Sequence, residues 1–221
     1  MNTNLVIVPS RSRAKNVDRF AKAFFETSKN SDLLIGIDSD QMDFYTKIEG
    51  VMYDVNPNLK LVPKLNLLAM KYADKYETIT FLGDDHVLKT EGWDVALAEP
   101  IKQFGYGISF ANDLFQTPML PTSAMVSTNI IKTLGFMCPP NLFHMYIDNF
   151  WGILGSRLNA LFYFENVIWE HMHFLNKKAD IDESYKETNG YLTRDQFAFH
   201  EYLADNFYND LQKVKKELKI G

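Results

Sequence analysis

Short apolar blocks alternate with polar loops along the first third of the chain. Residues 5–8, 33–37 and 78–82 are almost continuously apolar or β-branched, which is typical of parallel strands buried on both faces. Between the first two blocks, apolar side chains recur at helical spacing, namely Val17, Phe20, Ala21, Phe24 and Phe25. This strand–helix–strand order predicts a right-handed crossover, which brings the loops after both strands to one edge of the sheet.

The α/β pattern continues along the chain. We expect further strands at residues 51–55, 107–111, 123–127 and 161–169, the last broken at 165–166, and further helices at 42–47, 63–72, 94–103, 129–134 and from 148. Residues 112–121 are interpreted as a pocket wall or a flap, and the charged residues 176–189 as a surface loop.

The last part of the chain has a helical pattern at residues 194–218. It is expected to point Phe197, Tyr202, Phe207 and Leu211 inward. The fold class predicted from these patterns is α/β, a single Rossmann-like domain with a mixed, mostly parallel sheet flanked by helices. We assign residues 1–190 to this domain and residues 191–221 to a C-terminal helical extension that packs on it.

Composition excludes several classes of protein. Of the 221 residues 46% are hydrophobic, which is enough for a sizeable core, and the net charge of -5 lacks the basic footprint of a nucleic-acid-binding module. The single cysteine, Cys138, excludes an intramolecular disulfide, fits a reducing compartment and is interpreted as a structural thiol. An apolar run of only four residues near the N-terminus is neither a signal peptide nor a membrane span, so we expect a cytoplasmic protein without membrane insertion.

The first candidate for chemistry is the sequence Gly83-Asp84-Asp85-His86, directly after the expected strand at residues 78–82. In open α/β sheets ligands bind at the carboxyl ends of the strands. Carboxylates suit Mg²⁺ or Mn²⁺, and an imidazole shifts the preference toward Mn²⁺ or a later metal. A polar turn with a capping aspartate is an equally simple interpretation of this loop taken alone.

His171 and His173 follow the last expected strand at a spacing of two. In an extended segment such residues project from the same face, so both imidazoles can reach one metal ion. Two ordinary surface or core histidines would have the same spacing. An acidic loop at a neighbouring strand end favours the metal interpretation.

Asp148 stands where a helix is expected to begin. Its position alone favours an N-cap, and a general base held at the entrance of a pocket is the functional interpretation, which is compatible with it.

Three groups of polar residues belong to the same sheet edge. Pro9, Ser10, Arg11 and Arg13 follow the first strand, Asp38 and Asp40 follow the second, and Lys64 and Asn66 head the helix before the strand at residues 78–82. Arginines and backbone amides suit a diphosphate, and carboxylates suit a nucleobase or a ribose.

The chain has no Walker loop, no Gly-x-Gly-x-x-Gly and no Gly-x-Ser-x-Gly, which disfavours P-loop kinases, dinucleotide dehydrogenases and serine hydrolases.

In order and content these motifs resemble the GT-A class of nucleotide-sugar glycosyltransferases, family-two-type, over residues 5–173. The combination of Gly83-Asp84-Asp85-His86, Gly92-Trp93-Asp94 and His171-Met172-His173 is most similar to short phage-type glycosyltransferase-like proteins. Two positions depart from the family pattern. Gly83 replaces the first aspartate of the usual Asp-x-Asp, and Ile147 replaces the glutamate of the usual Glu-Asp.

The resemblance implies a role for each candidate residue. A divalent metal, Mn²⁺ or Mg²⁺, is expected on Asp85 with a choice among His86, His171 and His173, and Asp148 is expected to be the catalytic base. The donor-binding residues it implies are Pro9, Ser10, Arg11, Arg13, Asp38, Lys64, Asn66 and Asp84. The implied partner is a nucleotide-sugar donor. The implied reaction is transfer of the sugar to an acceptor hydroxyl, with inversion.

Two other interpretations of the motifs stay open. One is a catalytically degenerate GT-A domain that binds a nucleotide, a glycan or a partner protein, since Gly83 and Ile147 depart from the family pattern. The other is a nucleotidyltransferase on a similar sheet, although residues 9–13 lack the glycine- and lysine-rich loop that such enzymes use. The sequence leaves the acceptor open among a glycan, a protein, a metabolite and a modified DNA base.

Overall fold

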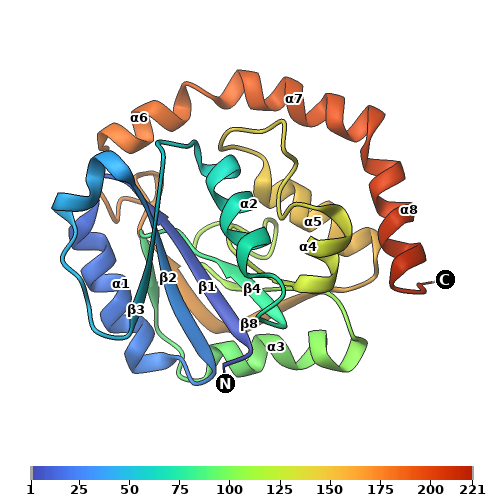
Figure 1. Cartoon of the computed structure of the whole chain (residues 1–221), viewed down its shortest axis with the longest axis horizontal. Coiled ribbons are helices and arrows are strands. Elements are labelled where there is room, and N and C mark those ends of the chain that lie inside the picture. Colours follow the sequence, from blue (N-terminus) through green and yellow to red (C-terminus); the bar gives the residue numbers. More distant parts are fainter. Residues whose placement is uncertain (1, 221) are drawn as a thin grey trace.

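The computed structural model describes residues 2–220, apart from the side chains of residues 183–185. Strands and helices alternate along the chain, as expected for an α/β protein (Figure 1). The strands are β1 Asn4–Ser10, β2 Ser31–Asp38, β3 Val51–Asn56, β4 Thr78–Phe81, β5 His86–Leu88, β6 Ile108–Asn112, β7 Ala124–Ser127 and β8 Leu161–His171. The helices are α1 Ala14–Thr27, α2 Leu61–Tyr72, α3 Trp93–Phe104, α4 Thr128–Leu134, α5 Ile147–Arg157, α6 Glu183–Asn189, α7 Leu192–Asp205 and α8 Phe207–Glu217, with 3-10 turns η1 Ser39–Phe44 and η2 Phe174–Asn176.

The strands form one sheet in the order β3-β2-β1-β4-β7-β6-β8-β5. Strands β3, β2, β1 and β4 pair in parallel, and so do β6 and β8, whereas β7 and β5 run against their neighbours. The carboxyl ends of β1, β2 and β4 therefore meet at one edge of the sheet. The predicted fold class, a mixed and mostly parallel sheet flanked by helices, is confirmed.

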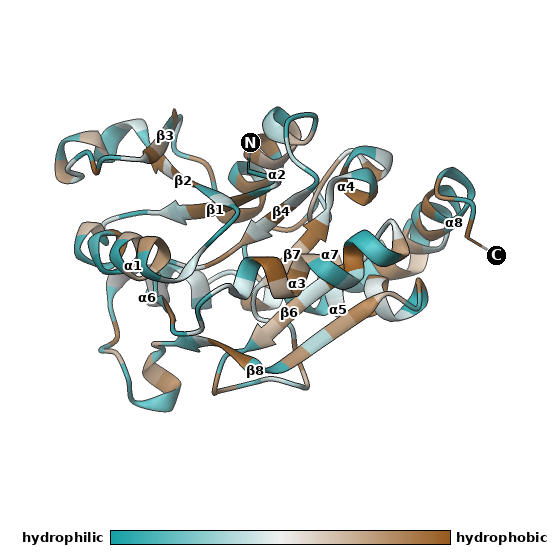
Figure 2. Cartoon of the chain, turned by 90° about the horizontal axis from the view of Figure 1, so that it is seen from below, coloured by the Kyte–Doolittle hydropathy of each residue, from teal (hydrophilic) through white to brown (hydrophobic). Residues whose placement is uncertain are grey.

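Both faces of the sheet are buried, which explains the continuous apolar runs. Alternate residues of β1 belong to different cores: Leu5 and Ile7 face helices α2, α4, α5, α7 and α8, while Val6 and Val8 face α1 and α3. Figure 2 shows hydrophobic residues gathered along the strands and hydrophilic residues on outward parts of the helices. Each core is closed by the amphipathic helices on its own side.

The C-terminal helices complete one of these cores. Phe199 and Tyr202 of α7 and Leu211 and Val214 of α8 are buried in the same cluster as β1, β4 and α5. Figure 1 shows α6, α7 and α8 following one another around the rim of the molecule. In the part of the chain that the structure describes, no helix has the length and apolar character needed to cross a membrane.

Local predictions were wrong at several places. The expected strand break at residues 165–166 is absent, because β8 runs through it and only its pairing with β6 shifts register. Residues 176–189 are not all loop, since α6 occupies the last seven of them. Phe197 was expected inside but is 73% exposed, because it lies two positions from the buried Asp195 and Phe199 and so on the opposite face of α7.

The Gly92-Trp93-Asp94 sequence holds two elements together at the amino edge of the sheet. Gly92 has a φ of +71° and donates its backbone N–H to the carbonyl of Thr27, the last residue of α1. The buried Asp94 carboxylate accepts the backbone N–H groups of Lys29 and Asn30, at 3.0 and 2.6 Å. It also accepts the Ser31 hydroxyl at 2.7 Å. The motif therefore fixes the turn between α1 and β2 and lies away from the carboxyl ends of β1, β2 and β4.

We expect Asp94→Asn to lower the free energy of unfolding by about 1.5–3 kcal/mol, because three charge-assisted hydrogen bonds become neutral ones. Urea denaturation checks this as a lower midpoint with an unchanged slope. A free energy of unfolding within about 0.5 kcal/mol of the wild-type value, which is the scatter of ordinary surface substitutions, would rule out this stabilising role of Asp94.

Candidate functional site

A cleft of about 400 Å³ opens at the carboxyl edge of β1, β2 and β4. This volume lies in the range of sites for small molecules and cofactors. Eleven predicted residues line it, namely Pro9, Ser10, Arg11, Arg13, Asp38, Lys64, Asp84, Asp85, His86, His171 and His173, and the predicted base Asp148 lines it as well. The edge predicted from the strand order thus brings these residues together.

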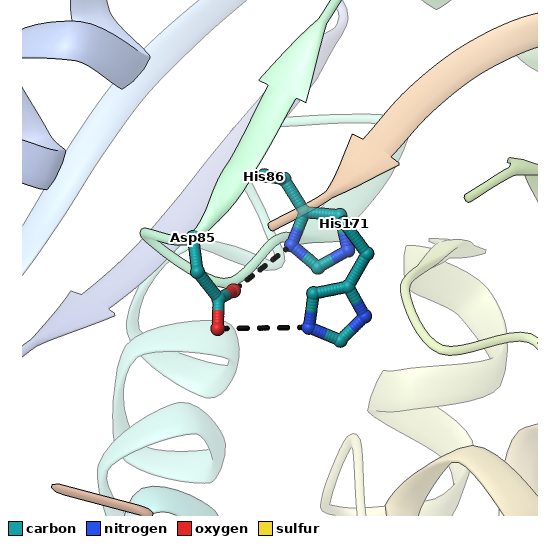
Figure 3. Close-up of side chains that lie close together, drawn as sticks. All are labelled: Asp85, His86 and His171. Carbon is teal, nitrogen blue, oxygen red and sulfur yellow. Dashed lines mark ion pairs between the residues drawn. The ribbon is translucent and has the colours of Figure 1, made fainter. Parts of the chain in front are cut away.

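Three of these side chains form a compact cluster. Strands β5 and β8 are antiparallel, and their register puts His86 directly opposite His171. Opposite residues of paired strands project from the same face, and here the two rings stack with centroids 4.4 Å apart. Asp85 Oδ1 lies 3.3 Å from His86 Nδ1, and Asp85 Oδ2 lies 3.5 Å from His171 Nε2. Figure 3 shows the carboxylate directed at both rings.

This cluster fits a divalent metal ion. One ligand atom from each of Asp85, His86 and His171 lies within 4.8 Å of the others. His86 Nδ1 is buried without a hydrogen-bond partner among the described residues, and its contact with Asp85 does not satisfy it. One carboxylate with two imidazoles suits Mn²⁺ and later metals better than Mg²⁺, which prefers oxygen ligands.

Gly83 has a steric reason to be glycine. A Cβ atom at this position would lie 2.5 Å from Asp85 Oδ1 and 3.2 Å from His86 Nδ1, the two atoms that face each other in the cluster. Such distances are shorter than real van der Waals contacts, so any side chain here would displace the Asp85 carboxylate. The glycine that replaces the first aspartate of an Asp-x-Asp loop therefore leaves the space that the Asp85 and His86 side chains occupy.

Charge in the cluster follows from burial and from its neighbours. Burial works to raise the pKa of Asp85, but His171 and His86 outweigh it and hold that pKa well below its usual range. Burial works to lower the pKa of His171, yet Asp113 and Asp85 raise it to about 9. The pKa of His86 is lowered, chiefly by burial. The cluster therefore holds an ionised Asp85 carboxylate next to two imidazole rings.

Arg13 joins the loop after β1 to the two acids. Its guanidinium donates to Asp84 Oδ1 at 3.2 Å and lies 3.6 Å from Asp85 Oδ2. The Ser10 hydroxyl donates to Asp84 Oδ2 at 2.6 Å. Burial and the neighbouring Asp85 raise the pKa of Asp84 to about 6, against the effect of Arg13. The Arg13 guanidinium therefore lies beside the cluster and pairs with both of its neighbouring acids.

Asp38 is the centre of a second charged group in the cleft. It is completely buried and receives Lys64 Nζ at 2.5 Å and Arg11 Nη1 at 3.0 Å. Arg11 also pairs with Asp40 through two hydrogen bonds, of 3.0 and 2.9 Å. Because α2 follows β3 closely, its first turn delivers Lys64 to the end of β2. The cleft therefore offers cationic donors and carboxylate acceptors side by side.

Asn66 and His173 are placed differently from our expectation. The Asn66 amide accepts the backbone N–H groups of Met137 and Cys138 and donates to the Cys138 carbonyl, so it fixes that loop and does not line the cleft. His173 lines the cleft, but the metal-compatible cluster of the described residues does not include it. Its Nδ1 instead accepts the N–H of Leu175 at 3.2 Å, which caps η2.

Asp148 lies in the first turn of α5 and is not the N-cap that its sequence position allowed. Tyr146 is the N-cap, with a φ of +68° that turns the chain into the helix. Burial raises the pKa of Asp148 to about 6, against its hydrogen bond with the Asn149 backbone. A carboxylate with this pKa is ionised at neutral pH and is still basic enough to accept a proton.

The segment that carries Asp148 is held by a residue that sequence patterns did not identify. Asp195 of α7 is completely buried and accepts the backbone N–H groups of Phe143, His144 and Met145, at 3.0, 2.8 and 2.8 Å. His144 and Met145 line the cleft. The C-terminal helices thus support the wall of the cleft as well as the core.

The segment around α6 also reaches the cleft. Asp182 receives two hydrogen bonds from Arg13, at 2.6 and 2.8 Å, and Glu187 receives Lys60 Nζ at 2.6 Å. Glu187 lies on the cleft wall. The charged residues that suggested a solvated loop are therefore partly used as partners for basic groups at the cleft.

Comparisons with other proteins give structural matches only. No protein-family model matches the chain, and no curated protein matches it in sequence. TarS of S. aureus, residues 1–349 in complex with UDP, matches with a TM-score of 0.56 and 12% identity, over 76% of this chain and 59% of that one. A second TarS structure matches 84% of this chain with a TM-score of 0.57 and 13% identity. This chain spans 41% of that one.

Two further matches cover more of both chains. The mannosyltransferase PcManGT of Pyrobaculum calidifontis, in complex with GDP-Man and Mn²⁺, has a TM-score of 0.58 and 10% identity, over 98% of this chain and 74% of that one. Rv0371C of Mycobacterium tuberculosis, in complex with manganese, has a TM-score of 0.51 and 10% identity, over 85% and 97%. At such low identity these likenesses show the fold, which is that of the GT-A glycosyltransferases.

Proposed function

We propose that the chain is a metal-dependent glycosyltransferase that moves a sugar from a nucleoside-diphosphate sugar to an acceptor hydroxyl, with inversion. The observation that carries this proposal is the cluster of Asp85, His86 and His171 at the carboxyl edge of a GT-A sheet, beside a cleft with cationic side chains. A GT-A match alone supports the fold. The cluster adds a reason to expect chemistry on a diphosphate.

Charge develops on the leaving nucleoside diphosphate as the sugar departs. Asp85, His86 and His171 would hold a divalent ion, which would supply Lewis-acid stabilisation of that charge. Arg13 adds a guanidinium that already lies 3.6 Å from Asp85 and 3.2 Å from Asp84. Arginine binds phosphate oxygens through two parallel hydrogen bonds, so it suits the diphosphate that we propose here.

The other end of the donor is assigned to the pair of Asp38 and Lys64. Asp38 Oδ1 faces Lys64 and Oδ2 faces Arg11, so this carboxylate is held in one orientation. A fixed, buried carboxylate is a suitable acceptor for N–H or O–H groups of a nucleobase or ribose.

Asp148 is assigned as the general base. A hydroxyl is a poor nucleophile at neutral pH, and a carboxylate with a pKa of about 6 can accept its proton during attack. Attack from the face opposite the leaving diphosphate inverts the anomeric centre. Nuclear magnetic resonance of the product decides this point, and a retained anomeric configuration would remove Asp148 from the role of base.

The proposal is tested by thermal unfolding with UDP, GDP and other nucleoside diphosphates and their sugars, each with Mn²⁺, with Mg²⁺ and with a chelator. We expect one nucleotide to raise the melting temperature only when metal is present, because a ligand that binds the folded state stabilises it by mass action. At a hundred times the dissociation constant the gain is about 2.7 kcal/mol.

Metal-dependent hydrolysis of the same sugar nucleotide is the second measurement, since slow transfer to water requires no knowledge of the acceptor. Stabilisation without any hydrolysis would favour a binding module that has lost catalysis. No stabilisation by any nucleotide in the presence of metal would rule out the donor site itself.

A further inference from the structure

The loop between β6 and β7 forms an outer layer around the histidine cluster. It begins at Asp113, directly after β6, and ends at Ser123, directly before β7. Both residues are buried, with exposed fractions of 2% and 3%. Gln116 and Thr122 of the same loop line the cleft. This one loop therefore lines the cleft and also reaches His171 and His86.

The two carboxylate oxygens of Asp113 have separate partners. Oδ1 holds the loop, because it accepts the backbone N–H groups of Phe115, Gln116 and Thr117 at 2.9, 2.8 and 3.0 Å. Oδ2 instead accepts the Thr122 hydroxyl at 2.8 Å and lies 3.8 Å from His171 Nδ1, a buried nitrogen without a direct hydrogen bond among the described residues. The second oxygen is thus directed at the ring nitrogen that points away from Asp85.

Backbone contacts keep this arrangement in register. The His171 N–H donates to the Asp113 carbonyl at 3.0 Å, so the end of β8 is tied to the start of the loop. At the far end of the loop, the Ser123 hydroxyl lies 3.3 Å from His86 Nε2. Each histidine of the cluster therefore has one nitrogen toward Asp85 and the other toward this loop.

We propose that Asp113 is a positioning residue for the metal site: when a metal ion takes the place of the proton on His171 Nε2, Asp113 Oδ2 keeps the other ring proton on Nδ1. The inference rests on the proposed function, because it concerns the same cluster. A carboxylate behind a metal-binding histidine fixes both the tautomer and the orientation of the ring. Asp113 contacts no ligand atom in this role and acts through His171.

Because the two carboxylate oxygens of Asp113 have different partners, asparagine is an informative substitution. Asp113→Asn can keep a carbonyl oxygen at the Oδ1 position, where the three backbone N–H groups are held. The amide then turns an NH₂ donor toward His171 Nδ1 and favours the tautomer with the proton on Nε2. That tautomer has no lone pair on Nε2, the nitrogen that faces Asp85 in the cluster.

The test is calorimetric titration of Mn²⁺ into wild type and variants. We expect Asp113→Asn to weaken Mn²⁺ binding 10- to 100-fold, the usual effect of losing such a partner. Thr117→Val is the control for loop damage, because its hydroxyl contacts Asp113 Oδ1 at 3.0 Å, the Asp113 backbone N–H and Asn112 Oδ1, all away from the Oδ2 that faces His171. It should change Mn²⁺ affinity less than threefold. Asp94→Asn controls for loss of a buried carboxylate elsewhere and should also bind Mn²⁺ normally.

A second measurement does not depend on a variant that folds. Long-range proton–nitrogen magnetic resonance of the wild-type protein with Zn²⁺, which is diamagnetic, reports the tautomer of His171 directly. We expect Nδ1 to be protonated and Nε2 to carry the metal. Protonation at Nε2 would overturn the inference.

The outcomes separate this inference from the proposed function. Mn²⁺ binding that Asp85→Ala abolishes and Asp113→Asn leaves within threefold of wild type would overturn the positioning role and leave the metal site intact. An equal loss in Thr117→Val and Asp113→Asn would show that Asp113 only holds the loop. Failure of the wild-type protein to bind Mn²⁺ or Zn²⁺ would overturn both.

Discussion

Asp85→Ala is expected to lower the rate of metal-dependent sugar transfer, or of sugar-nucleotide hydrolysis, by about 10³-fold or more. The reason is that Asp85 is the only carboxylate in the cluster with His86 and His171 among the described residues. A bound divalent ion supplies several kcal/mol of stabilisation to a developing charge, and each 1.36 kcal/mol is a factor of ten in rate. The same variant should lose the rise in melting temperature that Mn²⁺ causes in the presence of nucleotide.

The control is Glu91→Gln, which removes one carboxylate charge from a surface pair with Lys29. An exposed pair contributes little to stability, so this variant should keep both the rate and the Mn²⁺ effect. Because Arg13 also contacts Asp84 and Asp182, loss of Asp85 leaves that guanidinium with other acidic partners. An Asp85→Ala protein that still hydrolyses the donor in a Mn²⁺-dependent manner would contradict the assignment of the metal site.

The sequence was sufficient to place the metal-compatible loop, because that placement depends only on strand order. A buried run followed by Gly83 and two acids predicts polar groups at a sheet edge. The choice among the histidines depends on something else. His86 and His171 lie 85 positions apart in the sequence (171 − 86), and only the β5–β8 register sets them opposite each other. A register shift of one residue would have put a neighbour of His171 opposite His86, and the His171 side chain would no longer face it.

Residues that support the site were the hardest to predict. Asp113 and Asp195 each accept several backbone N–H groups of a nearby or distant loop, and a single aspartate in a polar segment carries no periodic signal of that role. Asn66 shows the opposite case, since its position beside Lys64 suggested a ligand contact while its side chain holds the Met137 and Cys138 backbone. Helical phase separates the two residues, and neither composition nor spacing reports which side chain turns into the cleft.

Asp148→Asn is expected to reduce transfer by about 10²- to 10⁴-fold and, at neutral pH, to make the protein more stable. The loss of rate follows from removing a general base. The gain in stability follows from burial, which raises the pKa of the Asp148 carboxyl to about 6 and makes its ionised form costly in the folded state. Raising this pKa from 3.8 to about 6 corresponds to about 3 kcal/mol. Because solvent reaches part of this side chain and the amide is itself buried, we expect a gain of about 1–2 kcal/mol.

The sign of the pH dependence distinguishes this explanation from a change in packing. The folded protein holds the Asp148 proton up to about pH 6, whereas the unfolded chain releases it near pH 4. The stabilising contribution of this carboxyl is therefore complete below about pH 4 and is lost as the pH rises through 6.

Urea denaturation of both proteins should thus give equal free energies of unfolding near pH 4 and a more stable Asp148→Asn above pH 7. The kcat/KM of the wild type should fall below about pH 6, where Asp148 takes up its proton. An advantage of Asp148→Asn that is the same at both pH values would mean that Asp148 does not titrate with a raised pKa. The general-base assignment would then lose its electrostatic support, because an aspartate with an ordinary pKa is a much weaker base at neutral pH.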